Sequence, residues 1–310
     1  MGYSPATSLC GDLASAAVDG CVGGHTSERG VSVSCGIDLN DVTIAYRGHP
    51  AVHHVSGCFV PGSLTAIIGP NGAGKSTLLG AIAGTRKLTQ GLIRFTSDSP
   101  ASDSQLAYLP QLSGINHDFP LRVIEVVAMG AWRALGSFAE VDAQLEQRID
   151  AALTKVGLQG FEARLVDELS VGQLQRVLFA RLIVQDAQMI LLDEPFNALD
   201  SRTADDLLHI IGQWHREGRT VVAVLHDLQM VRDHFPQTLL MARELIAWGP
   251  TQAVLVANLL QRAQGSSLAW HEAAPWCREP EGQVAIQVPT HAHDHGHSHA
   301  HAALPVDTKS

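Results

Sequence analysis

The sequence contains no long hydrophobic run and has fewer basic than acidic residues. No stretch of its 310 residues approaches the roughly 18 consecutive apolar residues that mark a membrane-spanning helix. Lys and Arg number 21 and Asp and Glu number 31, so the net charge is −10. This balance excludes a nucleic-acid or anionic-membrane binder that works by bulk electrostatic attraction. We therefore expect a globular protein with no membrane span of its own and no nucleic-acid partner.

Cysteine is scarce, and the spacing of the cysteines suggests no pairing. The five stand apart without a CxxC pair, as Cys10, Cys21, Cys35, Cys58 and Cys277. An odd, scattered set is typical of reduced thiols in a cytosol rather than of a disulfide framework. The N-terminal MGYSPATSLCGDLASA lacks a basic start followed by an apolar core, so we expect no secretory signal.

The chain divides into three predicted parts. Residues 1–37 are rich in Ser, Gly, Ala and Thr without strand or helix periodicity, which predicts a flexible extension. Residues 38–265 contain short apolar runs that alternate with helical patterns. After residue 265 the patterns fade into a C-terminal segment, 266–310, of low complexity.

The apolar runs of the middle part predict an α/β domain. SLTAIIG, QLAYLP, MILLDE and TVVAVLH are almost wholly apolar, as strands buried on both faces must be. Helical patterns separate several of them, so the sheet should be largely parallel. Residues 116–182 break this alternation with successive helix signals and no strand. We interpret them as a helical subdomain inserted into the α/β domain.

A glycine-rich loop supplies the first chemical motif. GPNGAGKS matches G-x-x-x-x-G-K-[ST] and lies between the apolar run LTAII and the helical pattern STLLGAIAG, the context that a phosphate-binding loop needs. Its backbone N–H groups and the helix N-terminus would face the phosphates. Lys75 would reach the β- and γ-phosphates, and the Ser76 hydroxyl would bind Mg²⁺. The predicted nucleotide-binding residues here are Gly69, Pro70, Asn71, Gly72, Ala73, Gly74, Lys75, Ser76 and Thr77.

Two carboxylates end the apolar run MILLDE. Ligand sites in parallel sheets lie at the carboxyl ends of strands, where the phosphate loop also lies. We therefore predict that Asp193 binds Mg²⁺ and that Glu194 polarises an attacking water. A strand that simply ends in solvated acids is the plainer alternative, and the accompanying phosphate loop disfavours it.

Further motifs give the chain a specific resemblance. LSVGQ at 169–173 is close to the signature Leu-Ser-Gly-Gly-Gln of ATP-binding-cassette (ABC) ATPases and lies 23 residues before Asp193. Gln111 matches the family's Q-loop, Asp200 its D-loop and His226 its switch histidine. Tyr46, 23 residues before Gly69, matches the aromatic residue that stacks on adenine, although it could equally be an ordinary strand residue. The resemblance covers roughly residues 38–250, with all motifs in the family's order.

The resemblance implies a P-loop NTPase fold of the ABC type, ATP and Mg²⁺ as cofactors, and ATP hydrolysis. It implies catalytic roles for Glu194, His226 and Gln111. A histidine after an apolar strand can also be a plain hydrogen-bonded core residue. The further implied sites are the magnesium ligands Ser76, Gln111 and Asp193 and the nucleotide contacts Tyr46, Ser170, Gly172, Gln173 and Asp200.

The signature also has a local structural meaning. Ser170 and Gln173 form an S-x-x-Q capping box at the start of a predicted helix. Such a start, with Gly172 in it, can bind an anion. The family implies that this anion is the γ-phosphate held by a second copy, which makes the protein a homodimer when ATP binds. Val171 replaces the usual first glycine; either the backbone there accepts a side chain, or hydrolysis is weakened.

The resemblance also suggests partners and a substrate. FPLRVIEVVAMG, at 119–130, resembles the stretch of ATPases that serve zinc and manganese importers. We expect an ATPase on the cytoplasmic face of the inner membrane, beneath two permease subunits that meet the helical subdomain and the Q-loop, with a separate metal-binding protein. The alternatives are an ATPase for another metal or an iron-chelate importer, and a soluble, non-transport ABC ATPase. A metal buffer with a vestigial cassette is disfavoured by the intact Lys75, Asp193 and Glu194.

The C-terminal tail carries separate chemistry. Histidines alternate there with small or acidic residues, at His291, His293, His295, His297, His299 and His301. Residues two apart point the same way in an extended chain, so two or three imidazoles can converge on one Zn²⁺. The alternatives are an expression tag or a solvated tail without a metal.

Overall fold

The computed structural model describes residues 36–47, 49–95, 106–111, 120–132 and 142–273. The predicted N-terminal extension lies outside these residues except for its last two. The histidine-rich tail also lies outside them, as do four of the five cysteines and the first residues of the predicted helical subdomain.

A six-stranded sheet forms the centre of the fold, in the order β5-β6-β7-β3-β8-β9. It is parallel from β5 to β8, and β9 pairs antiparallel with β8. All residues of β3, β6 and β7 are buried, because helices or the second sheet cover both faces. This arrangement confirms the predicted parallel sheet. The strands are β3 (Leu64–Ile68), β5 (Leu106–Leu109), β6 (Met189–Asp193), β7 (Thr220–Val224), β8 (Gln237–Ala242) and β9 (Glu244–Pro250).

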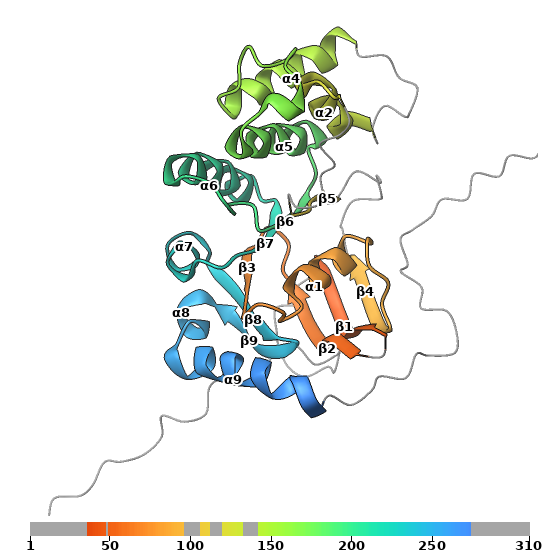
Figure 1. Cartoon of the computed structure of the whole chain (residues 1–310), viewed down its shortest axis with the longest axis vertical. Helices are drawn as coiled ribbons and strands as arrows, with labels where there is room; N and C mark the ends of the chain where they lie inside the picture. The colour runs from red at the N-terminus through yellow and green to blue at the C-terminus, as the bar shows by residue number, and fades with distance from the viewer. Residues whose placement is uncertain (1–35, 48, 96–105, 112–119, 133–141, 274–310) are drawn as a thin grey trace, which may run out of the picture.

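A second, three-stranded sheet was not predicted. It is antiparallel, in the order β2-β1-β4, and lies beside α1 (Lys75–Ile82) (Figure 1). One hydrophobic cluster joins its inner face to α1 and to the central sheet, through residues such as Ile44, Leu78 and Leu191. Helix α1, which follows the glycine loop, is therefore held between two sheets. The strands are β1 (Ile37–Tyr46), β2 (His49–Phe59) and β4 (Gln90–Phe95).

The predicted helical segment is a separate layer of helices (Figure 1). Within the described parts of 116–182 the structure has helices and 3₁₀ turns and no strand longer than an isolated bridge. Asp142 caps α4, whose apolar stripe includes the buried Leu145 and Ile149, and Gly157 follows the helix with φ of 71°. The elements are α2 (Val123–Ala128), α4 (Ala143–Lys155), α5 (Val171–Gln185) and the turns Met129–Ala131 and Val166–Glu168.

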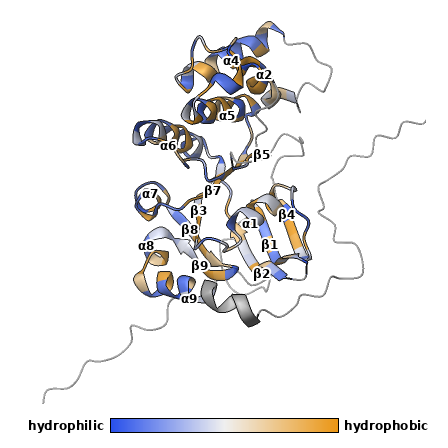
Figure 2. Ribbon diagram, viewed as in Figure 1, coloured by the Kyte–Doolittle hydropathy of each residue, from blue (hydrophilic) through white to orange (hydrophobic). Residues whose placement is uncertain are grey.

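The remaining helices lie along the central sheet. Helix α6 (Ser201–Arg216) has distinct polar and apolar faces (Figure 2) and buries Trp214 against Phe179. Further along the chain come α7 (Leu228–His234), α8 (Thr251–Val254) and α9 (Ala257–Ala273). No helix among the residues described above has the length and apolar character to cross a membrane.

Two features differ from the expectations. Helix α9 continues to Ala273, past the boundary expected at 265, because a helical backbone can continue after its apolar periodicity has ended. Cys58, in β2, is disulfide-bonded. The expectation of reduced thiols is therefore wrong for Cys58, since spacing along the chain does not show which thiols the fold brings together.

Candidate nucleotide site

The glycine loop between β3 and α1 has a backbone that requires glycine at two positions. Gly74 has φ of 88°, and a Cβ atom there would clash with the carbonyl oxygen of Ala51 in β2. A Cβ atom on Gly69 would clash with the carbonyl oxygen of Met241 in β8. The loop is therefore packed closely between two strands. Its Ala73 N–H donates to the Pro70 carbonyl oxygen at 3.2 Å.

Lys75 is buried at the first turn of α1. It is 5% exposed, and its Nζ donates to the carbonyl oxygens of Gly69 and Pro70, both at 3.0 Å. Burial lowers the pKa of Lys75, while the carboxylates of Glu194 and Asp193 oppose this shift. The ammonium group therefore lies against the loop, where it could bind a phosphate.

Ser76 and Asp193 form an oxygen pair beside the loop. The Ser76 hydroxyl donates to Asp193 Oδ1 at 2.8 Å. Burial raises the pKa of Asp193, and the hydrogen bond from Ser76 lowers it in part. Hydroxyl and carboxylate oxygens are the ligands that Mg²⁺ prefers, and a cation would offset the cost of the buried carboxylate. The pair therefore fits the predicted magnesium site.

The carboxylate of Glu194 contacts two residues that are far from it in the sequence, Gln111 and His226. Gln111 Nε2 donates to its Oε2 at 2.8 Å, and His226 Nε2 lies 2.7 Å from its Oε1. The three residues follow β5, β6 and β7, which are adjacent parallel strands, so their carboxyl ends share one edge of the sheet. The arrangement presents an oriented carboxylate that can accept a proton from water.

The sequence did not single out Asn197, which also approaches this carboxylate. Its Nδ2 donates to Glu194 Oε2 at 3.4 Å, and its N–H donates to the Glu194 carbonyl oxygen at 3.2 Å. Glu194 itself has φ of 50°. The proline that follows Glu194 is a turn signal, and a tight turn there could have been expected.

The predicted capping box is present at the start of α5. Gln173 N–H donates to Ser170 Oγ at 3.3 Å, and Ser170 N–H donates to Gln173 Oε1 at 3.0 Å. Val171 has a helical backbone and is 50% exposed, so this chain accepts a side chain there. A Cβ atom on Gly172 would meet only ordinary contacts, the nearest at 3.8 Å. Among the described residues, no hydrogen bond links Ser170 or Gln173 to the glycine loop.

Asp200 acts as the N-cap of α6. Its carboxylate accepts hydrogen bonds from the Thr203 N–H at 3.0 Å and the Thr203 hydroxyl at 2.8 Å, and these bonds lower its pKa. Thr203 in turn accepts a hydrogen bond from Arg176 at 3.3 Å. The structure therefore gives Asp200 a capping role, and its contact with nucleotide stays a prediction.

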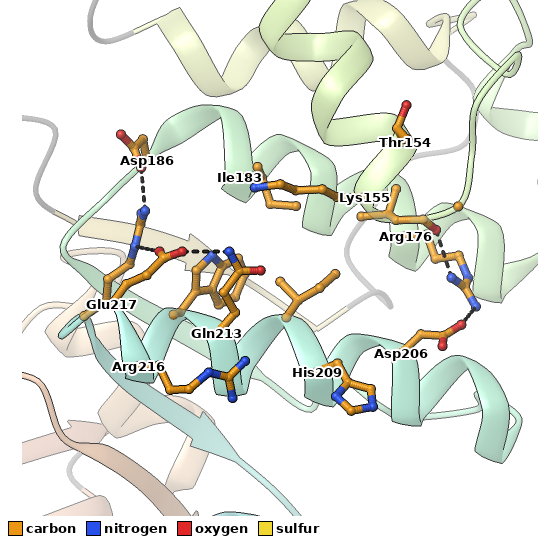
Figure 3. A pocket seen from close by; sticks show the side chains of 15 residues that line it. Thr154, Lys155, Arg176, Ile183, Asp186, Asp206, His209, Gln213, Arg216 and Glu217 are labelled. Carbon is orange, nitrogen blue, oxygen red and sulfur yellow. Dashed lines mark hydrogen bonds and ion pairs between the residues drawn. The ribbon is translucent and has the colours of Figure 1, made fainter.

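Arg176, which sequence reasoning passed over, joins three helices. Its guanidinium donates to the carbonyl oxygen of Val156 after α4 at 2.8 Å and pairs with Asp206 of α6 at 2.7 Å (Figure 3). Arg176 lines a cleft between α4, α5 and α6. Arg219 lines the same cleft and pairs with Asp186 at 2.7 Å. The start of the signature helix and the start of α6 are thus fixed to each other.

Tyr46 lies at the end of β1 and is 44% exposed. It pairs with His49, the first residue of β2, and Ala51 in the same strand contacts Gly74 of the loop. Tyr46 is therefore an exposed residue on the strand pair that flanks the glycine loop. Stacking on adenine stays a prediction.

Comparison with known proteins agrees with this geometry. The model of the ABC transporter family matches residues 52–197. The zinc transport system ATP-binding protein TroB of Treponema pallidum is 38% identical over 234 residues, which is 75% of this chain and 88% of that protein. The chain belongs to the ABC transporter ATPase family. Its members hydrolyse ATP, so this ABC ATPase is an enzyme.

Other relatives and solved structures extend the comparison. The manganese transport system ATP-binding protein MntB of Bacillus subtilis is 36% identical over 76% of this ABC ATPase and 94% of that protein. A structure described as a metal-chelate type ABC transporter, in an inward-facing conformation, is 26% identical with a TM-score of 0.66, covering 75% of this chain and 90% of that one. A bacterial ABC transporter cassette solved as a dimer is 25% identical with a TM-score of 0.61, covering 69% and 98% of the two chains.

Proposed function

We propose that this ABC ATPase binds and hydrolyses ATP to power a membrane importer of metal ions, and that zinc is the ion. The main support for an ATPase site is that Gln111 and His226 contact the Glu194 carboxylate, next to the hydrogen-bonded pair Ser76 and Asp193. The metal is supported by relatives named for zinc and manganese transport. The histidine-rich tail favours zinc over manganese, because imidazole suits Zn²⁺ and the harder Mn²⁺ prefers oxygen ligands.

Each residue of the site has a proposed role. Lys75 and the loop's N–H groups bind the β- and γ-phosphates, and Tyr46 stacks on adenine. Ser76, Asp193 and Gln111 hold Mg²⁺, which would neutralise phosphate charge. Glu194 accepts the proton of the attacking water. His226, hydrogen-bonded to Glu194, faces the γ-phosphate.

The signature residues of α5 are proposed to act in a second copy of the chain. Ser170, Gly172 and Gln173 lie at a capped helix start, and no contact within the described residues demands glycine at 172. A ligand from outside the chain that approaches the backbone closely would explain why residue 172 is glycine. Two copies would then enclose two ATP molecules, and Asp200 would lie near their interface.

The helical segment and the Q-loop are proposed to meet two permease subunits. Gln111 hydrogen-bonds Glu194 and lies two residues after the end of β5, so movement of this segment changes the contacts of the proposed general base. The protein would then work on the cytoplasmic face of the inner membrane. A separate metal-binding protein would deliver the ion from the other side.

A transport measurement tests the function. Cells that lack this protein, supplied with the wild type or with Glu194→Gln, are assayed for uptake of radioactive Zn²⁺ and Mn²⁺. We expect the wild type to restore Zn²⁺ uptake and Glu194→Gln to restore less than about a tenth of it, because the water loses its base. Glu146→Gln, an exposed carboxylate on α4, is the matched control and should behave as the wild type.

Restored Mn²⁺ uptake with unchanged Zn²⁺ uptake would show that the ion is manganese. If neither ion responds to the wild-type protein, the importer proposal fails.

The histidine tail is proposed to bind Zn²⁺ and is tested by truncation. A chain that ends at residue 289 should bind Zn²⁺ more weakly than the full chain at pH 7.5. Neutral imidazole is the ligand form and its reference pKa is about 6.5, so the difference should shrink toward pH 5.5. ATP hydrolysis without added zinc should be equal in both. Equal zinc binding at pH 7.5 would refute the tail site.

A further inference from the structure

A cavity of about 750 Å³ extends from the proposed magnesium end of the site toward the helical segment. Its walls come from the start of α1, from the turn that follows α1, from β5 and from the second half of α5. The lining includes Ser76, Asp193 and Gln111 of the proposed magnesium site together with Arg86, Tyr108 and Arg181. The cavity is therefore continuous with the place where the γ-phosphate would be cleaved.

Arg181 is a partly buried cation in the wall of this cavity. Its Nε is inaccessible to solvent and has no hydrogen-bond partner, and the guanidinium forms no ion pair with any residue that the structure describes. Burial lowers the pKa of Arg181, yet a guanidinium still keeps its charge near neutral pH. An unpaired buried charge is costly, and buried polar groups without partners are rare in native proteins. None of the described residues supplies an anion to Arg181, so an anion bound in the cavity would offset this cost.

The charges around Arg181 favour an anion in the cavity. The one carboxylate among the described residues of the lining is Asp193, which already accepts the hydrogen bond from Ser76 and is attracted to Lys75. Arg86, exposed in the turn after α1, adds a second guanidinium to the lining. Tyr108 also lines the cavity. Burial raises the pKa of its hydroxyl, Asp193 adds to that shift and Arg86 opposes it, so the hydroxyl remains a donor.

We propose that Arg181 and Arg86 bind inorganic phosphate, the product of ATP hydrolysis, on its way out of the site. Guanidinium groups present paired N–H donors that match phosphate oxygens, and the phenol of Tyr108 is a further donor. The phosphate would leave the γ-position past Gln111 while ADP remains on the glycine loop. This inference rests on the proposed assignment of Ser76 and Asp193 to the magnesium end.

The test fills the γ-position and then measures phosphate binding. The full chain is saturated with Mg²⁺ and the β,γ-imido analogue of ATP, and inorganic phosphate is titrated by calorimetry. The wild type should bind one phosphate per chain. Arg181→Gln should weaken this binding at least about tenfold, since a charge-assisted hydrogen-bond pair is lost. Arg86→Gln should weaken it severalfold, and Arg181→Lys should retain part of it.

Two controls separate the outcomes. Affinity for the analogue should be equal in all variants, and Arg216→Gln, an exposed arginine on α6 outside this cavity, should bind phosphate as the wild type does. Analogue binding without phosphate binding, or equal phosphate binding by wild type and Arg181→Gln, overturns this inference alone. Failure of the wild type to bind the analogue overturns the nucleotide site and this inference with it.

Discussion

Glu194 holds a backbone conformation that carries a cost. Its φ of 50° is in the left-handed region, which costs a non-glycine residue on the order of 1 kcal/mol. Three hydrogen bonds hold Glu194 in this conformation. Its N–H donates to the Val224 carbonyl oxygen at 3.2 Å, and its carboxylate contacts Gln111 and His226. The strained residue is therefore the one proposed as general base.

Substitution of Lys75 tests its role in binding phosphate. Burial lowers its pKa even though Glu194 and Asp193 attract it, so the folded protein disfavours the ammonium group when no phosphate is present. We expect Lys75→Met to melt at the same temperature as the nucleotide-free wild type or higher, and to lose the rise in melting temperature that ATP causes. Thermal unfolding with and without Mg²⁺ and ATP measures both. A full ATP-induced rise in Lys75→Met would remove the lysine from the site.

Helices α5 and α6 show how the elements are tied together. Both start with a side-chain cap, from Ser170 and Asp200, and Arg176 joins the two starts through Thr203. A shift of one helix start therefore strains the other. This link crosses between the helical segment and the α/β part of the fold, so the orientation of the signature depends on it.

Arg176→Gln tests this link. Its side chain is 16% exposed, and the substitution removes hydrogen bonds to Val156, Thr203 and Asp206. Because Asp206 is half exposed, we discount the ion pair and expect a loss of about 1–2 kcal/mol in the free energy of unfolding. ATP hydrolysis should fall while ATP affinity holds. The measurements are denaturant unfolding and steady-state kinetics.

The control for Arg176→Gln is a pair of neighbouring acids. Asp206→Asn should lose part of the same stability, and combined with Arg176→Gln it should add little. Asp205→Asn, one residue earlier and without an ion pair, should change stability by less than about 0.5 kcal/mol. Full additivity of Arg176→Gln and Asp206→Asn would mean that the pair carries no coupling.

The elements that sequence reasoning predicted are those defined by local patterns. The buried strand before the glycine loop, the capping box at Ser170 and the stripe of α4 each show in a few consecutive residues. The run LNDVTIAY of β1 has a strand pattern, but the antiparallel sheet was missed because β2 is only partly apolar and its pairing with β1 shows in no local pattern. The extent of α9 was missed because its last residues carry no apolar period.

At the scale of the whole molecule, the site depends on strand order. Gln111, Glu194 and His226 were each predicted from a separate motif. Only the adjacency of β5, β6 and β7 brings Gln111 and His226 to the carboxylate of Glu194. The role of Arg176 could not be predicted, since it depends on contacts between helices that no local pattern records. Nor could a pattern show that Arg181 has no ion pair within the described residues. The contacts of Ser170, Gly172 and Gln173 with a second copy stay predictions for the same reason.

We propose that Glu194 activates the water that cleaves ATP. The most direct measurement is single-turnover hydrolysis of Mg-ATP by the full chain, with ATP affinity measured separately, for wild type, Glu194→Gln and the control Glu146→Gln. We expect unchanged ATP affinity in all three, wild-type turnover in Glu146→Gln, and hydrolysis at least about tenfold slower in Glu194→Gln. Turnover by Glu194→Gln at the wild-type rate would show that Glu194 does not activate the water.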